Sequence, residues 1–173
     1  MKNIFAVLFA AVLLLSLQSC PKGAVEPIED PKISEAELMD IPAFDWYTSM
    51  KRSYETDPVF ISEIEAKFDA DSFRFLVFLS PCSICSAKQF EAPRFVRALN
   101  DAGIGEEFYE FYSLPAFPKG EYPYMDILEI KRLPGLFVLK NDVPVYSILD
   151  TLTDVASKST FSIERLLSEA LDK

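Results

Sequence analysis

The stretch Phe73-Arg-Phe-Leu-Val-Phe-Leu-Ser-Pro-Cys-Ser-Ile-Cys85 decides the fold. Its first seven residues are an almost unbroken apolar and aromatic run, typical of a strand that is buried on both faces of a sheet. Ser80-Pro81 ends this strand, and Cys82 and Cys85 follow at the start of a predicted helix. Unpaired N–H groups and the helix dipole stabilise an anion at such a position. We therefore expect a thiolate at Cys82 and a lowered pKa for this thiol.

The composition restricts the classes of function. Half of the 173 residues are hydrophobic, which is enough for the core of one domain. The formal net charge of -10 argues against electrostatic binding of nucleic acid or anionic lipid. The chain has no histidine, the commonest general base and metal ligand. Any chemistry must therefore come from cysteine, carboxylate, lysine or tyrosine side chains.

The N-terminal segment predicts export. A basic start precedes a short apolar run, Ile4–Leu17, which is typical of a secretory signal rather than a spanning helix. The sequence Leu17-Gln-Ser-Cys20 then resembles the lipobox of bacterial lipoproteins. This resemblance implies cleavage before Cys20 and attachment of a lipid to that cysteine. An ordinary signal peptide with a stray cysteine, or an uncleaved anchor helix, is the alternative.

The chain divides into four predicted parts. They are a lipoprotein signal peptide (1–19), a proline-containing tether (20–33), an N-terminal extension (34–56) and a folded domain (57–173). In the extension, Ser34-Glu-Ala-Glu37 predicts a capping box at the start of a short helix. The aromatic residues of 41–56 fit either a short first strand or a helical segment packed on the domain.

Apolar spacing and turn residues predict the elements of the domain. Helices are expected from Asp57-Pro58 to residue 68, from the cysteines to Asn100 with a kink at Pro93, and over 124–131 and 161–171. Strands are expected over 73–79, 108–114, 136–139 and 143–149, the last two joined by a turn at Asn141-Asp142. Pro144 inside the last strand predicts a position at the sheet edge.

This order of elements around a Cys-x-x-Cys helix resembles the thioredoxin fold over residues 57–172. The resemblance implies an α/β domain with a central mixed sheet of about four to five strands flanked by helices, here preceded by a helical or irregular N-terminal extension. Pro134, just before a predicted strand, is the second marker. By resemblance, Leu133-Pro134 is a cis peptide bond that lies against Cys82. Together with Pro81, Leu133 and Pro134 would shape a substrate groove.

The sequence departs from thioredoxin itself at several positions. Pro81 replaces the tryptophan before the first cysteine, and Leu76 replaces the buried acid. The proline of the following helix lies at Pro93, and Ser83-Ile84 separates the cysteines. The redox potential of better-known members therefore does not transfer to this chain.

The predicted function is thiol–disulfide exchange without a cofactor or a metal. Cys82 would attack a disulfide, and Cys85, on the same helix face, would resolve the mixed disulfide. The absence of a histidine between them favours a reductase or isomerase. The expected partners are exported cysteine-containing proteins and a membrane thiol carrier, with no nucleic acid. The expected location is the cell envelope, lipid-anchored and periplasm-facing or surface-exposed, with the choice of membrane left open.

Three other interpretations remain. The cysteine pair could be a permanent structural disulfide, although so short a loop gains little stability. A metal role would have only two thiols and no histidine. The chain could also be a non-catalytic lipoprotein adaptor whose contact surface comprises residues 41–56 and 115–123, with Phe117, Tyr122 and Tyr124.

Overall fold

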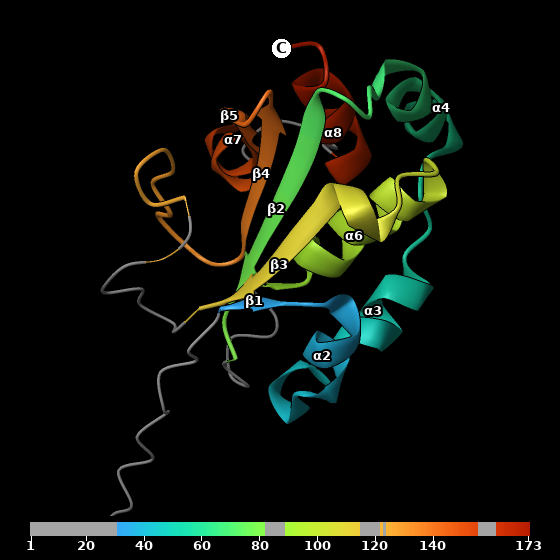
Figure 1. The fold of residues 1–173 in the computed structure, drawn as a ribbon. Coiled ribbons are helices and arrows are strands. Elements are labelled where there is room, and N and C mark those ends of the chain that lie inside the picture. The colour runs from blue at the N-terminus through green and yellow to red at the C-terminus, as the bar shows by residue number, and fades with distance from the viewer. Residues whose placement is uncertain (1–30, 82–88, 115–121, 123, 156–161) are drawn as a thin grey trace, which may run out of the picture.

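The computed structural model describes residues 31–81, 89–114, 122, 124–155 and 162–173. They form an α/β fold in which helices flank a mixed five-stranded sheet (Figure 1). The strands, in the spatial order β1-β3-β2-β4-β5, are β1 (Lys32–Ile33), β2 (Phe73–Leu79), β3 (Tyr109–Ser113), β4 (Gly135–Lys140) and β5 (Val143–Ser147). The predicted fold class is confirmed, and this arrangement is compatible with a thioredoxin-like fold.

The strand directions bring four chain positions to one end of the sheet. β2 runs parallel to β3, with Leu79 paired to Ser113. β1 is antiparallel to β3, and β4 is antiparallel to β2. The last residues of β2 and β3 therefore lie at the same end as the first residues of β1 and β4, Lys32 and Gly135. We call this the carboxyl end of the sheet.

The side chains of β2 alternate between two cores. Phe73, Phe75, Val77 and Leu79 face a large core, which we call the helix-side core. Its other members come from α2 (Glu35–Asp40), α4 (Pro58–Lys67), α6 (Glu91–Asp101), α7 (Ile148–Val155) and α8 (Ile163–Ala170), among other elements. Leu76 and Phe78 face a smaller core on the opposite side of the sheet. This loop-side core is covered by Tyr122, Tyr124, Leu128, Ile130 and Leu133.

Local sequence signals start two helices where they were predicted. Ser34 and Glu37 form a complete capping box at the start of α2. Asp57 caps α4 by accepting a 2.9 Å hydrogen bond from the N–H of Val59, and Pro58 occupies the first helical position. Both predictions are confirmed.

The aromatic stretch 41–56 packs as a helical segment. It forms the 3-10 turn η1 (Pro42–Phe44) and α3 (Tyr47–Ser53). Phe44 and Tyr47 are fully buried in the helix-side core. Of the two predicted alternatives, a short strand and a packed helix, the structure has the second.

Three predicted elements differ from the structure. The interruption predicted at Pro93 lies at Phe90, between helical Gln89 and the start of α6 at Glu91, so Pro93 occupies the first turn of α6, where a missing N–H loses no hydrogen bond. No helix forms over 124–131: residues 124–127 make a turn that begins with a left-handed φ of 66° at Tyr124, and residues 128–131 have no regular structure. The strand expected over 143–149 ends at Ser147, after which α7 begins.

Candidate functional site

The predicted cysteine pair lies outside the described residues, but both ends of its segment are fixed. β2 ends at Leu79, and the N–H of Ser80 donates to the side-chain oxygen of Gln89 at 2.8 Å. The side-chain amide of Gln89 donates back to the carbonyl of Ser80 at 3.0 Å. Both residues are buried. The chain therefore leaves the sheet at Ser80 and is held to the same point again at Gln89.

The predicted groove residues flank this point. β4 pairs with β2 so that Gly135 lies opposite Phe78. One residue further in this register, Pro134 lies beside Leu79, at the end of the strand that leads into the predicted cysteine pair. Pro134 is buried, and the bond between Leu133 and Pro134 is cis, as predicted. The structure thus brings Leu133, Pro134 and the end of β2 together, and half-buried Pro81 follows that end directly.

Gly135, the first residue of β4, leaves room for the ring of Phe137 in the same strand. A Cβ atom at this position would lie 2.9 Å from the ring of Phe137 and 3.4 Å from the Cβ of Phe78. A larger residue would therefore displace the Phe137 ring within the loop-side core, next to Pro134. No local pattern in the sequence indicates this requirement.

Aromatic side chains support the site from both sides of the sheet. In the loop-side core, Phe78 stacks on Tyr112 with ring centroids 5.0 Å apart and meets Tyr122 edge-on at 6.5 Å. On the other side, Trp46 meets Phe90, the residue after Gln89, at 5.5 Å. The N-terminal extension therefore contacts the segment that follows the predicted cysteines.

Two supporting residues, Gln89 and Trp46, were missed as site residues. Gln89 is buried, and a buried amide needs hydrogen-bond partners. Its burial is known only from the fold. The contact of Trp46 with Phe90 joins residues that are far apart in the chain, and no local pattern indicates it.

The described part of the site carries no ionisable side chain at its centre. Ser80, Pro81, Gln89 and Pro134 are all uncharged. The nearest charged residues along the described chain have partners: Arg132 lies 3.3 Å from Asp150, and Glu91 lies 3.1 Å from Arg94. The described residues that flank the predicted cysteine pair are therefore uncharged at their centre.

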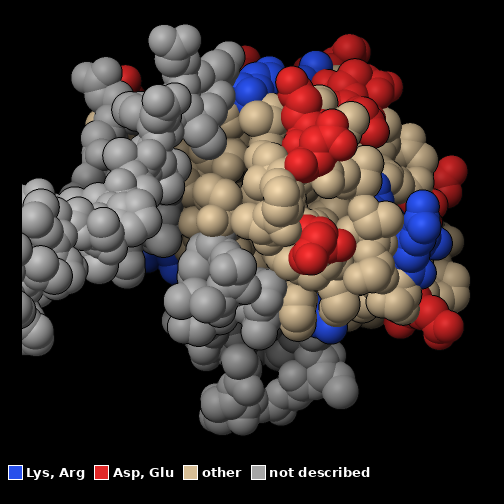
Figure 2. Space-filling model, turned by 90° about the horizontal axis from the view of Figure 1, so that it is seen from below, with Lys and Arg blue, Asp and Glu red and all other residues tan. Residues whose placement is uncertain are grey.

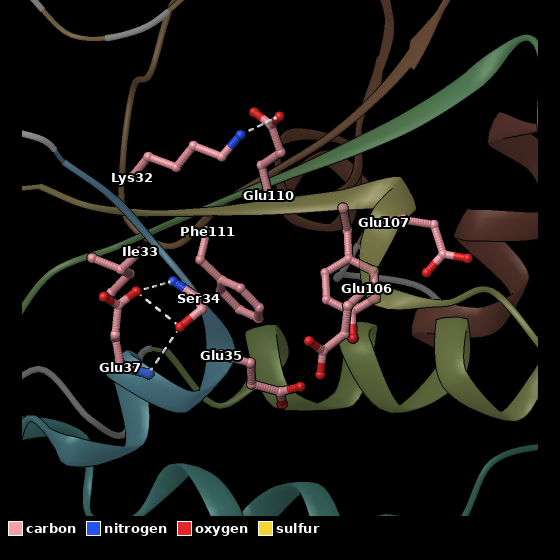
Figure 3. A pocket seen from close by; sticks show the side chains of 10 residues that line it. Lys32, Ile33, Ser34, Glu35, Glu37, Glu106, Glu107, Glu110 and Phe111 are labelled. Atoms are coloured by element: carbon pink, nitrogen blue, oxygen red, sulfur yellow. Dashed lines mark hydrogen bonds and ion pairs between the residues drawn. The ribbon is translucent and has the colours of Figure 1, made fainter.

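A groove of about 460 Å³ lies beside β1, β3, α2 and the 3-10 turn η3 (Glu106–Phe108) (Figure 3). Several of its carboxylates already have partners. Glu35 accepts a hydrogen bond from Lys51 at 2.6 Å, Glu37 belongs to the capping box, and Glu110 is paired with Lys32 at 2.6 Å. Among the described residues, no group of three metal-ligating side chains gathers here or elsewhere.

Glu110 forms the most connected carboxylate of this region. Burial would raise its pKa, but hydrogen bonds from Lys32, Tyr112 and Tyr124 and the charge of Lys32 outweigh burial and lower the pKa below 4.5. Burial and the neighbouring carboxylate together raise the pKa of Tyr112. Glu110 therefore stays a carboxylate and the tyrosines stay neutral. The hydrogen bonds among these side chains connect β1 to β3 and to the turn at Tyr124.

The aromatic surfaces expected for an adaptor contribute to packing in the described residues. Phe44 and Tyr47 are buried, and Tyr122 and Tyr124 pack on the loop-side core. Phe117 lies outside the described residues. Exposed apolar side chains nearby are Met125 and Ile127, at 44% and 51% exposure.

The predicted lipidation site, Cys20, also lies outside the described residues. Across the part of the chain that is described, no helix is long and apolar enough to cross a membrane. Comparison with known proteins found no matching family model, no matching curated protein and no matching solved structure.

Proposed function

We propose that this chain is a lipid-anchored, thioredoxin-like thiol–disulfide oxidoreductase of the cell envelope. Its substrates would be exported proteins with cysteines. A membrane thiol carrier would reduce the Cys82–Cys85 disulfide back to the dithiol. The observation that carries this proposal is the register of β2 and β4. It puts Pro134 beside the end of the strand that leads directly into Cys82-Ser-Ile-Cys85.

The chemistry needs only the two thiols. The Cys82 thiolate attacks a substrate disulfide, forms a mixed disulfide and releases one substrate sulfur as a thiolate. The Cys85 thiolate then attacks Cys82, which releases the second substrate thiol and leaves the 82–85 disulfide. Two electrons pass from the pair to the substrate. The described residues around the predicted pair, Ser80, Pro81, Gln89 and Pro134, are uncharged, and no histidine lies between the two cysteines. Both features favour a reductase or isomerase over a strong oxidant.

Insulin reduction tests the proposal. The reduced protein should reduce insulin disulfides in the presence of a regenerating dithiol, and Cys82→Ser should lower the rate to the uncatalysed level, because the attacking sulfur is gone. Cys85→Ser should accumulate mixed disulfides with partner proteins, visible on non-reducing gels. Ser83→Ala, between the two cysteines, is the matched control and should keep most of the activity.

Equal rates for the wild type and Cys82→Ser would contradict the enzymatic proposal and favour an adaptor. The anchor is tested separately by mass spectrometry of the N-terminal peptide from the membrane fraction. A lipid on Cys20 is expected, and Cys20→Ser should release the protein from the membrane.

A further inference from the structure

The groove beside β1, β3, α2 and η3 carries an excess of negative charge. Of the described residues that line it, one is basic, Lys32, and five are acidic: Glu35, Glu37, Glu106, Glu107 and Glu110. Lys32 is paired with Glu110, and Lys51 of α3 is paired with Glu35. Within the part of the chain that the structure describes, Glu106 and Glu107 form no ion pair. The lysines at the groove therefore do not balance its carboxylates.

A buried hydroxyl without a partner lies on the inner side of this groove. Tyr47 is fully buried, and its hydroxyl has no hydrogen-bond partner among the described residues. Its ring meets the groove residue Phe111 edge-on at 6.2 Å. Glu35 lies next to the hydroxyl without meeting hydrogen-bond geometry, and burial together with this carboxylate raises the pKa of Tyr47, so the phenol stays protonated.

This hydroxyl is directed at the groove rather than at the core. The other groups whose charge acts on it are Tyr109 and Glu106, which line the groove as Glu35 does. Buried polar groups are nearly always hydrogen-bonded, so an unpartnered one among groove residues marks a position that a ligand completes.

The groups around this position suit an ammonium ion. No set of three metal-ligating side chains gathers within the described residues, which argues against a metal ion as the ligand. An alkylammonium has three N–H donors and needs three acceptors. The side chains of Glu35 and Glu106 extend toward one another (Figure 3) and, with the Tyr47 oxygen, supply these acceptors. Ile33 and Phe111 add apolar surface for a carbon chain, and an aromatic ring also attracts a cation.

We propose that this groove binds an aliphatic primary ammonium group, held between the carboxylates of Glu35 and Glu106 and the hydroxyl of Tyr47. A free polyamine and a lysine side chain of another protein both present this group on a carbon chain. The volume of about 460 Å³ lies in the range of small-ligand pockets. Acidic side chains gather on one side of the molecule when it is seen from below (Figure 2), which attracts cations over a longer range. The proposal does not depend on the cysteine pair.

Calorimetric titration of the full chain with spermidine tests this site. One spermidine should bind per chain, with an affinity that falls as salt is added, and the neutral octanediol should not bind. The peptide N-acetyl-Gly-Lys-Gly-amide separates the two sources of the group. Tighter binding of the peptide would assign the site to a protein partner, and tighter binding of spermidine would assign it to a free amine. If neither binds saturably, the proposal is wrong.

Single substitutions locate the bound group. Glu106→Gln and Tyr47→Phe should each weaken the binding of the preferred amine about tenfold, because each removes a hydrogen bond to a charged group. Glu65→Gln, at an exposed position of α4, changes the net charge as Glu106→Gln does and should leave the affinity unchanged. Equal affinities of the wild type and all three variants would reduce the binding to general charge attraction and overturn the site.

The stability of Tyr47→Phe supplies a second test that needs no amine. Because the lost hydroxyl has no partner within the described chain, the midpoint of urea denaturation should stay the same or rise. A lower midpoint would show that the hydroxyl is satisfied inside the protein and is not available to a ligand.

Discussion

The side chain of Gln89 extends the hydrogen bonding of β2 beyond its last residue. Its amide donates to and accepts from the backbone of Ser80, as a neighbouring strand would. Because both residues are buried, water cannot replace these bonds. The position of the chain on either side of the predicted cysteines thus depends on one amide group.

Gln89→Ala should lower the free energy of unfolding by about 2–4 kcal/mol, because it leaves two buried backbone groups of Ser80 without partners. Urea denaturation followed by tryptophan fluorescence measures this loss. Gln89→Glu keeps the acceptor but loses the donor at neutral pH, so its defect should shrink as acid protonates the new carboxylate. A loss below about 0.5 kcal/mol for Gln89→Ala would show that water satisfies Ser80.

Glu110 predicts a pH dependence of stability. Its folded pKa is lowered, so its contribution is present above the unfolded pKa and is lost as the pH falls through the folded value. The difference in unfolding free energy between the wild type and Glu110→Gln should therefore shrink between about pH 6 and about pH 3. Denaturant titrations at both values measure it. Glu129→Gln, at an 82% exposed side chain, is the control and should show little change.

Among the elements, the β4–β5 hairpin has a connecting turn with a strict backbone requirement. Asn141 and Asp142 both have positive φ, 53° and 62°, as in a type I′ turn. This turn twists the strands in the sense that a sheet requires. β5 is the edge strand, as Pro144 predicted, and a register shift lies between Val138 and Leu139 of its partner.

Asp142→Gly should raise the free energy of unfolding by about 0.5–1 kcal/mol, because glycine adopts positive φ without steric cost. Asp142→Val should lower it by about 1–2 kcal/mol, because a β-branched side chain is strained there. Thermal unfolding of both variants gives the comparison. Equal stability of the two variants would contradict the assigned turn.

The sequence predicted those elements that have local signals. The cap at Asp57, the apolar run of β2 and the turn at Asn141 lie within the segments that they define. β1 was missed because two residues gain their strand geometry only by pairing with β3, which is distant in the chain. α7 had a local signal that was overlooked: Ser147, just before the helix, bonds to Asp150 at 2.9 Å.

For the site, the sequence predicted the cis proline but not the residues that support the site. Pro134 was identified by resemblance, and the structure puts it beside the end of β2. The hydrogen bonds between Gln89 and Ser80 and the contact of Trp46 with Phe90 depend on three-dimensional packing between separate segments. Such contacts leave no fixed spacing in a single sequence.

At the scale of the whole molecule, the N-terminal extension shares a core with the rest of the chain. Leu38, Phe44 and Tyr47 are at most 1% exposed and belong to the helix-side core. α3 packs on α6, and β1 completes one edge of the sheet. The boundary predicted at residue 57 therefore cuts through a continuous set of packed side chains.

A chain that begins at Asp57 should not fold stably. Loss of three buried side chains removes about 5–8 kcal/mol of hydrophobic stabilisation, which is comparable to the total stability of a domain. Circular dichroism during urea denaturation should show no cooperative transition for residues 57–173. Residues 31–173 are the control and should unfold cooperatively. A cooperative transition of similar midpoint in both would establish residue 57 as an autonomous boundary.

The bidentate contact between Ser80 and Gln89 also has a use in engineering. It joins the two residues, Ser80 and Gln89, between which positions 81–88 of the chain lie. For a flexible insert between two joined residues, each doubling of its length adds only about 0.6 kcal/mol of loop-closure entropy. Foreign redox or metal-binding peptides could therefore be grafted between these two anchors without redesign of the sheet.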